Sequence, residues 1–187
     1  MAVRRGLDEA LDDYLVLLAQ GGSSDAFARL AARWTPKLAA FAARALGTTE
    51  QAKDVVQDVW EAAWRGIKRL DDPARFRAWL YAIAARKCAD ALRGKYRGRR
   101  ITEAADAQAT LDASAQPDGE RAAAERLDLT AALKRLPADQ PIAVSLFFGE
   151  DMSVAEIAAV TGAAPGTVKS RLFAARKALR ANLGEEK

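Results

Sequence analysis

The sequence has few of the residues that build metal sites and acid–base catalytic centres. Its 187 residues include a single cysteine, Cys88, and no histidine. One cysteine excludes an internal disulfide, and the lack of histidine excludes the common thiolate–imidazole metal sites and histidine-based catalysis. We therefore expect no metal and no cofactor, and we interpret Cys88 as a small buried helical residue rather than a redox sensor.

A membrane-spanning segment is missing as well. No apolar run approaches the roughly 20 residues that a helix needs to cross a bilayer. The N-terminal residues 1–5 contain two arginines and are followed by acidic residues, without the apolar core of a signal peptide. We therefore predict a cytoplasmic protein that does not insert into a membrane.

Strand patterns are also missing, and helical periodicity dominates. Half of the residues are hydrophobic, but many are alanines, which favour helices and add little core volume. A helix is predicted from Ser24 to Gly47, with Pro36 expected to kink or split it, and another over residues 74–93. The first helix has its apolar stripe at Leu7, Leu11, Tyr14, Leu15 and Leu18. We predict an all-α fold.

Composition divides the chain into three parts. Residues 101–120 contain five acidic residues and no basic one, and Ile101 and Leu111 are their only large aliphatic residues. Such a segment cannot build a core, so we predict a flexible acidic linker over 101–120. It would join an N-terminal helical domain, 1–100, to a C-terminal domain, 121–187.

The strongest local signal is a helix-turn-helix in the C-terminal domain. Ser153 and Glu156 form a capping box, and Gly162 ends a short helix before a longer one begins. This arrangement seats the second helix in the major groove of DNA. One face of that helix holds polar and basic residues around a phenylalanine, and we predict that it binds DNA through Gly166, Thr167, Lys169, Ser170, Arg171, Phe173, Arg176 and Lys177.

Phe173 is the informative residue on this face, because a phenylalanine that faces water has no role in folding. It can contact a thymine methyl group in the groove. The alternatives are that it packs on the first domain or is a singly exposed apolar residue.

The first domain has one acidic and one basic surface. The acidic stripe is made of residues at helical spacing, Asp54, Gln57, Asp58 and Glu61. It is a poor DNA surface, so it is either a solvated face or a protein-binding site. The net charge of the chain is only +4, so the placement of basic residues matters, and they concentrate in residues 86–100.

Basic residues interleaved with aromatic ones suit opened or single-stranded DNA. The alternative is a basic helix end stabilised by the helix dipole, and Trp79 taken alone is more often a core residue. The candidates for this site are Arg75, Trp79, Arg86, Lys87, Arg93, Tyr96 and Arg97.

Three segments, taken in order, resemble the extracytoplasmic-function (ECF) group of bacterial RNA polymerase sigma factors. They are DVVQDVWEAAW at 54–64, RFRAWLYAIAARKCADALRGKYR at 75–97, and LKRLPADQPIAVSLFFGEDMSVAEIAAVTGAAPGTVKSRLFAARKAL at 133–179. The similarity as a whole extends over nearly all of residues 25–183 in the right order, and GTVKSRLFAARKAL is its most specific piece.

The resemblance implies a promoter-recognition subunit with no catalysis of its own. The helix from Asp54 would dock on a coiled coil of the polymerase β′ subunit, with Gln57 and Asp58 at the matching positions. The loop and helix after residue 70 would open the −10 element, and the last helix would read the −35 element. The implied partners are the polymerase core, through its β′ and β subunits, promoter DNA and an anti-sigma protein.

Two other functions compete with this one. A helix-turn-helix regulator that acts without polymerase would explain the C-terminal domain but not the acidic stripe. An enzyme acting on nucleic acid could hold Mg²⁺ at acidic pairs such as Asp71 and Asp72, but no glycine-rich phosphate loop lies near them.

Overall fold

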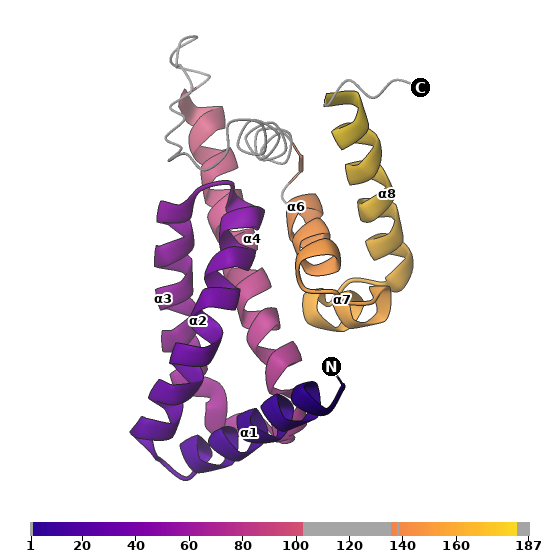
Figure 1. Cartoon of the computed structure of the whole chain (residues 1–187). Helices are drawn as coiled ribbons and strands as arrows, with labels where there is room; N and C mark the ends of the chain where they lie inside the picture. The colour runs from indigo at the N-terminus through magenta and orange to yellow at the C-terminus, as the bar shows by residue number, and fades with distance from the viewer. Residues whose placement is uncertain (1, 103–135, 138, 183–187) are drawn as a thin grey trace, which may run out of the picture.

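The computed structural model describes residues 2–102, 136–137 and 139–182, and side chains within 6–94 and 136–180 (Figure 1). All regular structure in these ranges is helical, which confirms the predicted all-α class. Most of the predicted linker lies outside the described residues. The elements are α1 Ala2–Gln20, α2 Ser24–Leu46, α3 Thr49–Gly66, η1 Ile67–Arg69, η2 Pro73–Arg75, α4 Phe76–Thr102, α6 Asp139–Val144, η3 Ser145–Gly149, α7 Val154–Thr161 and α8 Pro165–Asn182.

Helix α2 shows how the local sequence determines where a helix begins and ends. The Ser23 side chain accepts a hydrogen bond from the Ala26 N–H at 3.2 Å, and Gly47 ends the helix in the left-handed region at φ 74°. The helix continues through Pro36, so the predicted split is wrong. Pro36 is exposed, where water can hydrogen-bond the carbonyl that its missing N–H leaves free.

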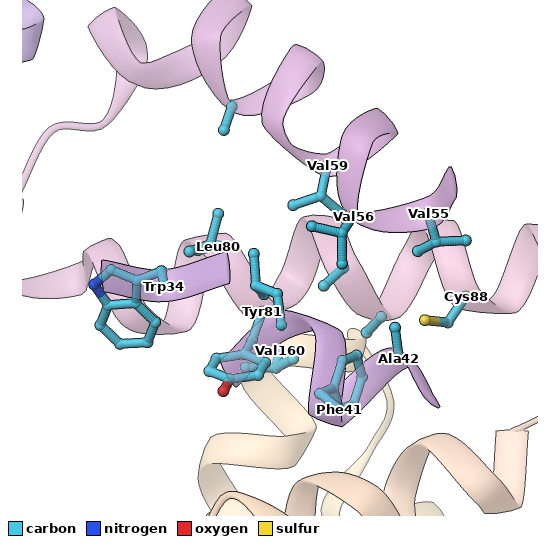
Figure 2. Close-up of a cluster of buried hydrophobic side chains, with 14 of the residues drawn as sticks. Trp34, Phe41, Ala42, Val55, Val56, Val59, Leu80, Tyr81, Cys88 and Val160 are labelled. Carbon is cyan, nitrogen blue, oxygen red and sulfur yellow. The ribbon is translucent and has the colours of Figure 1, made fainter. Parts of the chain in front are cut away.

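The first bundle packs α2, α3 and α4 side by side, with α1 across one end (Figure 1). Figure 2 shows part of its core, in which Phe41, Val59, Leu80 and Tyr81 are fully buried. The rings of Phe41 and Tyr81 meet edge to face with centroids 5.5 Å apart. Such aromatic pairs add to the stabilisation that burial alone gives.

The second bundle, α6 to α8, packs against α4 and joins the same core. Four of its buried side chains, Ile142, Leu146, Ile157 and Val160, belong to the cluster that contains Tyr81. Figure 2 shows Val160 beside Tyr81. The sequence suggested two compact helical units, whereas in the described residues the main core is shared by both bundles and a smaller cluster around Leu136 and Ala175 belongs to the second bundle alone.

The orientation of α1 differs from the prediction. Leu7, Tyr14 and Leu18 of the predicted inward stripe are exposed. The buried face instead includes Asp12, whose carboxylate accepts hydrogen bonds from Arg33 Nε at 2.8 Å and Trp34 Nε1 at 3.1 Å. This polar anchor fixes the rotation of the helix, because a buried carboxylate must keep its donors.

Cys88 provides a first test of the core. Its side chain is fully buried, and burial raises the pKa of the thiol to about 12. Because the thiolate is the reactive form, we expect Cys88 to resist alkylation at neutral pH in the native protein and to react fully in denaturant. Mass spectrometry after timed iodoacetamide treatment measures this, and rapid alkylation of the native chain would contradict the packing.

Candidate nucleic-acid and protein interfaces

The turn between α7 and α8 has the geometry that the sequence predicts. Ser153 Oγ accepts from the Glu156 N–H at 3.2 Å, and Glu156 Oε2 accepts from the Ser153 N–H at 2.8 Å. Gly162 ends α7 in the left-handed region at φ 68°. The capping box is therefore confirmed, and the tight turn positions α8 against α7.

Helix α8 buries one side and exposes the other. Val168 and Ala175 are fully buried, whereas seven of the eight predicted DNA-binding residues are exposed, namely Gly166, Thr167, Lys169, Ser170, Phe173, Arg176 and Lys177. Phe173 is 72% exposed, so it does not pack on the first bundle. The exposed side presents cations around an aromatic ring, as a groove-binding helix requires.

Arg171, the eighth residue, is placed differently. Its side chain is 27% exposed and its Nη2 lies 2.6 Å from a carboxylate oxygen of Asp139, at the start of α6. Arg171 must leave this ion pair, or share it, before it can contact DNA. Its contribution to base recognition stays a prediction.

The acidic stripe lies on the outer side of α3. Asp54, Gln57, Asp58 and Glu61 are all exposed, and the opposite side of the helix buries valines. Glu61 pairs with Arg65 one turn away, at 3.7 Å. The stripe is a continuous polar surface, available to a partner.

Sequence reasoning missed Trp64, which borders this stripe. Its side chain is 48% exposed, and its ring meets Phe27 of α2 with centroids 4.9 Å apart. Trp60 lies one turn earlier and donates from Nε1 to Thr35 Oγ1 at 2.9 Å. The signal in the sequence was the Trp60–Trp64 spacing of four residues on the flank of the stripe.

The predicted basic residues of α4 and of the segment before it form only part of the expected surface in the described structure. Arg75, Arg86 and Arg93 are exposed, and Arg93 pairs with Asp90 at 2.6 Å. The side chains of Tyr96 and Arg97 lie outside the described residues. The described cations therefore offer an exposed basic edge along α4.

Trp79 is a packing residue in this structure. It is half-buried against the core, and a Cβ placed on Gly66 would lie 3.1 Å from its ring carbon Cζ2. This close approach between the end of α3 and α4 supports the core interpretation of Trp79.

The predicted protein-binding and DNA-binding surfaces touch each other at one ion pair. Lys87 Nζ of α4 lies 3.0 Å from Asp58 Oδ2 of α3. The two sides of the first bundle are therefore electrostatically connected, so a partner that engages Asp58 also changes the environment of Lys87.

Within the residues that the structure describes, no group of three or more acidic, cysteine or histidine side chains is arranged to hold a metal ion. Across the same residues, none of the helices combines the length and apolarity that crossing a bilayer requires.

Two family models match the chain, one for each bundle. The model for sigma-70 region 2 matches residues 30–98, and the model for sigma-70 region 4 matches residues 126–179. The matches follow the order of the two bundles, and the second contains most of α8.

Similar proteins cover most of the chain. The ECF RNA polymerase sigma factor SigL of Mycobacterium tuberculosis is 38% identical over 78% of this chain and 81% of its own length. The RNA polymerase sigma factor CarQ of Myxococcus xanthus is 35% identical over 88% of this chain and 92% of its own.

Solved structures show the same fold. CnrH, in complex with the cytosolic domain of CnrY, has a TM-score of 0.66 at 31% identity and covers 95% of this chain and 99% of its own. The sigma factor RpoE of Bartonella quintana, in complex with the anti-sigma factor NepR, has a TM-score of 0.67 at 27% identity, covering 86% and 98%.

Proposed function

The chain belongs to the ECF group of RNA polymerase sigma factors, and on that premise we propose which of its surfaces performs each part of promoter recognition. As a sigma factor it directs RNA polymerase to promoters and initiates transcription. We propose that α3 binds the polymerase core, that α4 contacts the −10 element, and that α8 reads the −35 element. The chain itself would catalyse nothing and would act in the cytoplasm beside the polymerase.

The exposed side of α8 is the observation that carries this proposal. It presents Lys169, Arg176 and Lys177 around Phe173, and its described residues include no acidic side chain. Cations on a groove-binding helix supply phosphate contacts, which fix position, while side chains at the base edges supply sequence preference. Phe173 is placed to meet a thymine methyl group.

The α3 stripe supports the polymerase assignment. Its acidic residues would repel DNA, so they suit a protein surface with basic groups. Trp64 adds exposed aromatic area next to the stripe, a residue type that is enriched in protein interfaces. When the polymerase engages Asp58, it would release Lys87 toward the DNA.

A division into domains 1–100 and 121–187 joined by a linker remains part of the proposal. The −10 and −35 elements are centred about 25 base pairs apart, roughly 85 Å at about 3.4 Å per base pair. Bundles that share one core cannot lie on both elements of an unbent duplex. We propose that the bundles separate when polymerase binds, and that an anti-sigma protein holds them together, as the partners of CnrH and RpoE suggest.

A pull-down with purified core polymerase tests the proposal against a regulator that acts alone. Retention of the chain by core polymerase is the expected result. Binding to promoter DNA without retention by polymerase would favour the polymerase-independent regulator.

The predicted base contacts are testable one side chain at a time. We expect Lys169→Ala and Arg171→Ala each to weaken binding to a −35 duplex by about 1–3 kcal/mol if the side chain meets a base. Lys68→Ala, which removes an exposed lysine from η1, is the matched control. Fluorescence anisotropy at fixed salt measures the change, and unchanged binding removes that residue from the site.

A further inference from the structure

We infer that Arg44 and Tyr81 of the first bundle form a carboxylate-binding site, with Arg77 as a further donor to the backbone, and that Glu150 of the second bundle fills it to lock the chain closed. This inference rests on the proposed function, because closure matters only if the two bundles must separate on a promoter.

Three donors from two helices of the first bundle converge on Glu150. Arg44 Nη2 donates to Oε1 of the Glu150 carboxylate, and the Tyr81 hydroxyl donates to Oε2. Arg77 Nη2 donates to the backbone carbonyl of Glu150 at 2.5 Å. Both carboxylate oxygens and the carbonyl of one residue are thus held by the opposite bundle.

The site selects a carboxylate over a neutral group. Arg44 supplies a charge-assisted hydrogen bond, and the Glu150 side chain is only 10% exposed, so water screens the pair weakly. Tyr81 is fully buried, and burial, followed by the hydrogen bond to Glu150, raises the pKa of its phenol. The phenol therefore keeps its proton at neutral pH. An amide at position 150 would lose the negative charge that pairs with Arg44, and Tyr81 would have to accept a hydrogen bond instead of donating one.

The end of η3, directly before Glu150, leaves room for the Arg44 side chain. A Cβ placed on Gly149 would lie 2.3–2.5 Å from three atoms of the Arg44 guanidinium group. Glycine at 149 therefore lets the guanidinium lie against the end of η3. The Arg44 Nε is buried without an acceptor among the described residues, so Arg44 has a further donor for a carboxylate.

Apolar contacts surround this polar connection. Met152, Ile157 and Val160 follow Glu150 in the chain and are buried in the shared core. Separation of the bundles exposes these side chains and empties the site in one step. Occupation of the site by Glu150 and spanning of the two promoter elements are therefore mutually exclusive states of the chain.

Small-angle X-ray scattering on the full chain, with Glu150→Gln and Gly149→Ala as variants, tests the inference. The first removes the charge, and the second displaces Arg44 while keeping every charged group. We expect both variants to have a larger radius of gyration than wild type and to bind core polymerase at least about threefold more tightly, since they no longer compete with closure. Asp25→Asn, which neutralises an exposed carboxylate in the first turn of α2, is the control and should match wild type.

If both variants have the same radius of gyration and the same affinity for core polymerase as wild type, the inference is wrong. Circular dichroism of each variant separates opening from unfolding, and Gly149→Ala decides the outcome if Glu150→Gln does not fold. Wild-type transcription is measured in parallel. If the wild type supports promoter-dependent transcription but both variants stay closed, only the carboxylate site is refuted. If the wild type supports no transcription, the proposed function itself is refuted.

Discussion

The Asp58→Arg variant is expected to lose its affinity for core polymerase. Asp58 lies at the centre of the exposed stripe of α3, and reversing its charge would place two like charges together in the proposed interface. Such contacts cost several kcal/mol, and a loss of about 2.8 kcal/mol already corresponds to roughly 100-fold in Kd. Biolayer interferometry with immobilised core polymerase measures the affinity.

Two controls isolate the interface from its neighbours. Lys87→Ala breaks the same ion pair from the α4 side, and we expect it to keep polymerase affinity. Asp25→Arg makes the same charge change at an exposed position of α2, where it should have little effect. An Asp58→Arg chain that binds polymerase as tightly as wild type would remove α3 from the interface.

Phe41→Ala is expected to destabilise the chain by about 3–5 kcal/mol, the range for removing a buried aromatic ring. Phe41 is fully buried and packs edge to face on Tyr81, so the truncation leaves a cavity in the core of the first bundle. Because a typical domain is stable by only about 5–15 kcal/mol, this change should lower the urea midpoint sharply.

Phe173→Ala is the matched control, since it removes the same ring from a side chain that is 72% exposed. We expect a stability change within about 0.5 kcal/mol, together with weaker DNA binding. Equal destabilisation by the two variants would show that α8 is packed in solution and that its exposed side is not free for DNA.

The sequence correctly predicted the features that depend only on residues close together in the chain. The capping box of Ser153 and Glu156 and the left-handed glycines Gly47 and Gly162 were predicted from short-range spacing, because each depends on residues within one turn. The exposed side of α8 was predicted from helical periodicity, because its apolar positions are few and regularly spaced.

Features that depend on distant residues could not be predicted in the same way. Periodicity placed Leu7 and Tyr14 of α1 toward the core, but the donors that hold Asp12 come from α2, over 20 positions away in the chain. The contact of Glu150 with Tyr81 joins residues 69 positions apart. Sequence patterns identify which residues are apolar or charged; they do not show which distant partner a buried charge will find.

Transcription by purified core polymerase over a library of promoters, with and without the chain, tests whether the chain directs the polymerase to specific promoters. We expect core polymerase alone to start no specific transcripts, and addition of the chain to yield defined start sites downstream of one class of −35 and −10 sequences. Identical transcript profiles with and without the chain would contradict it.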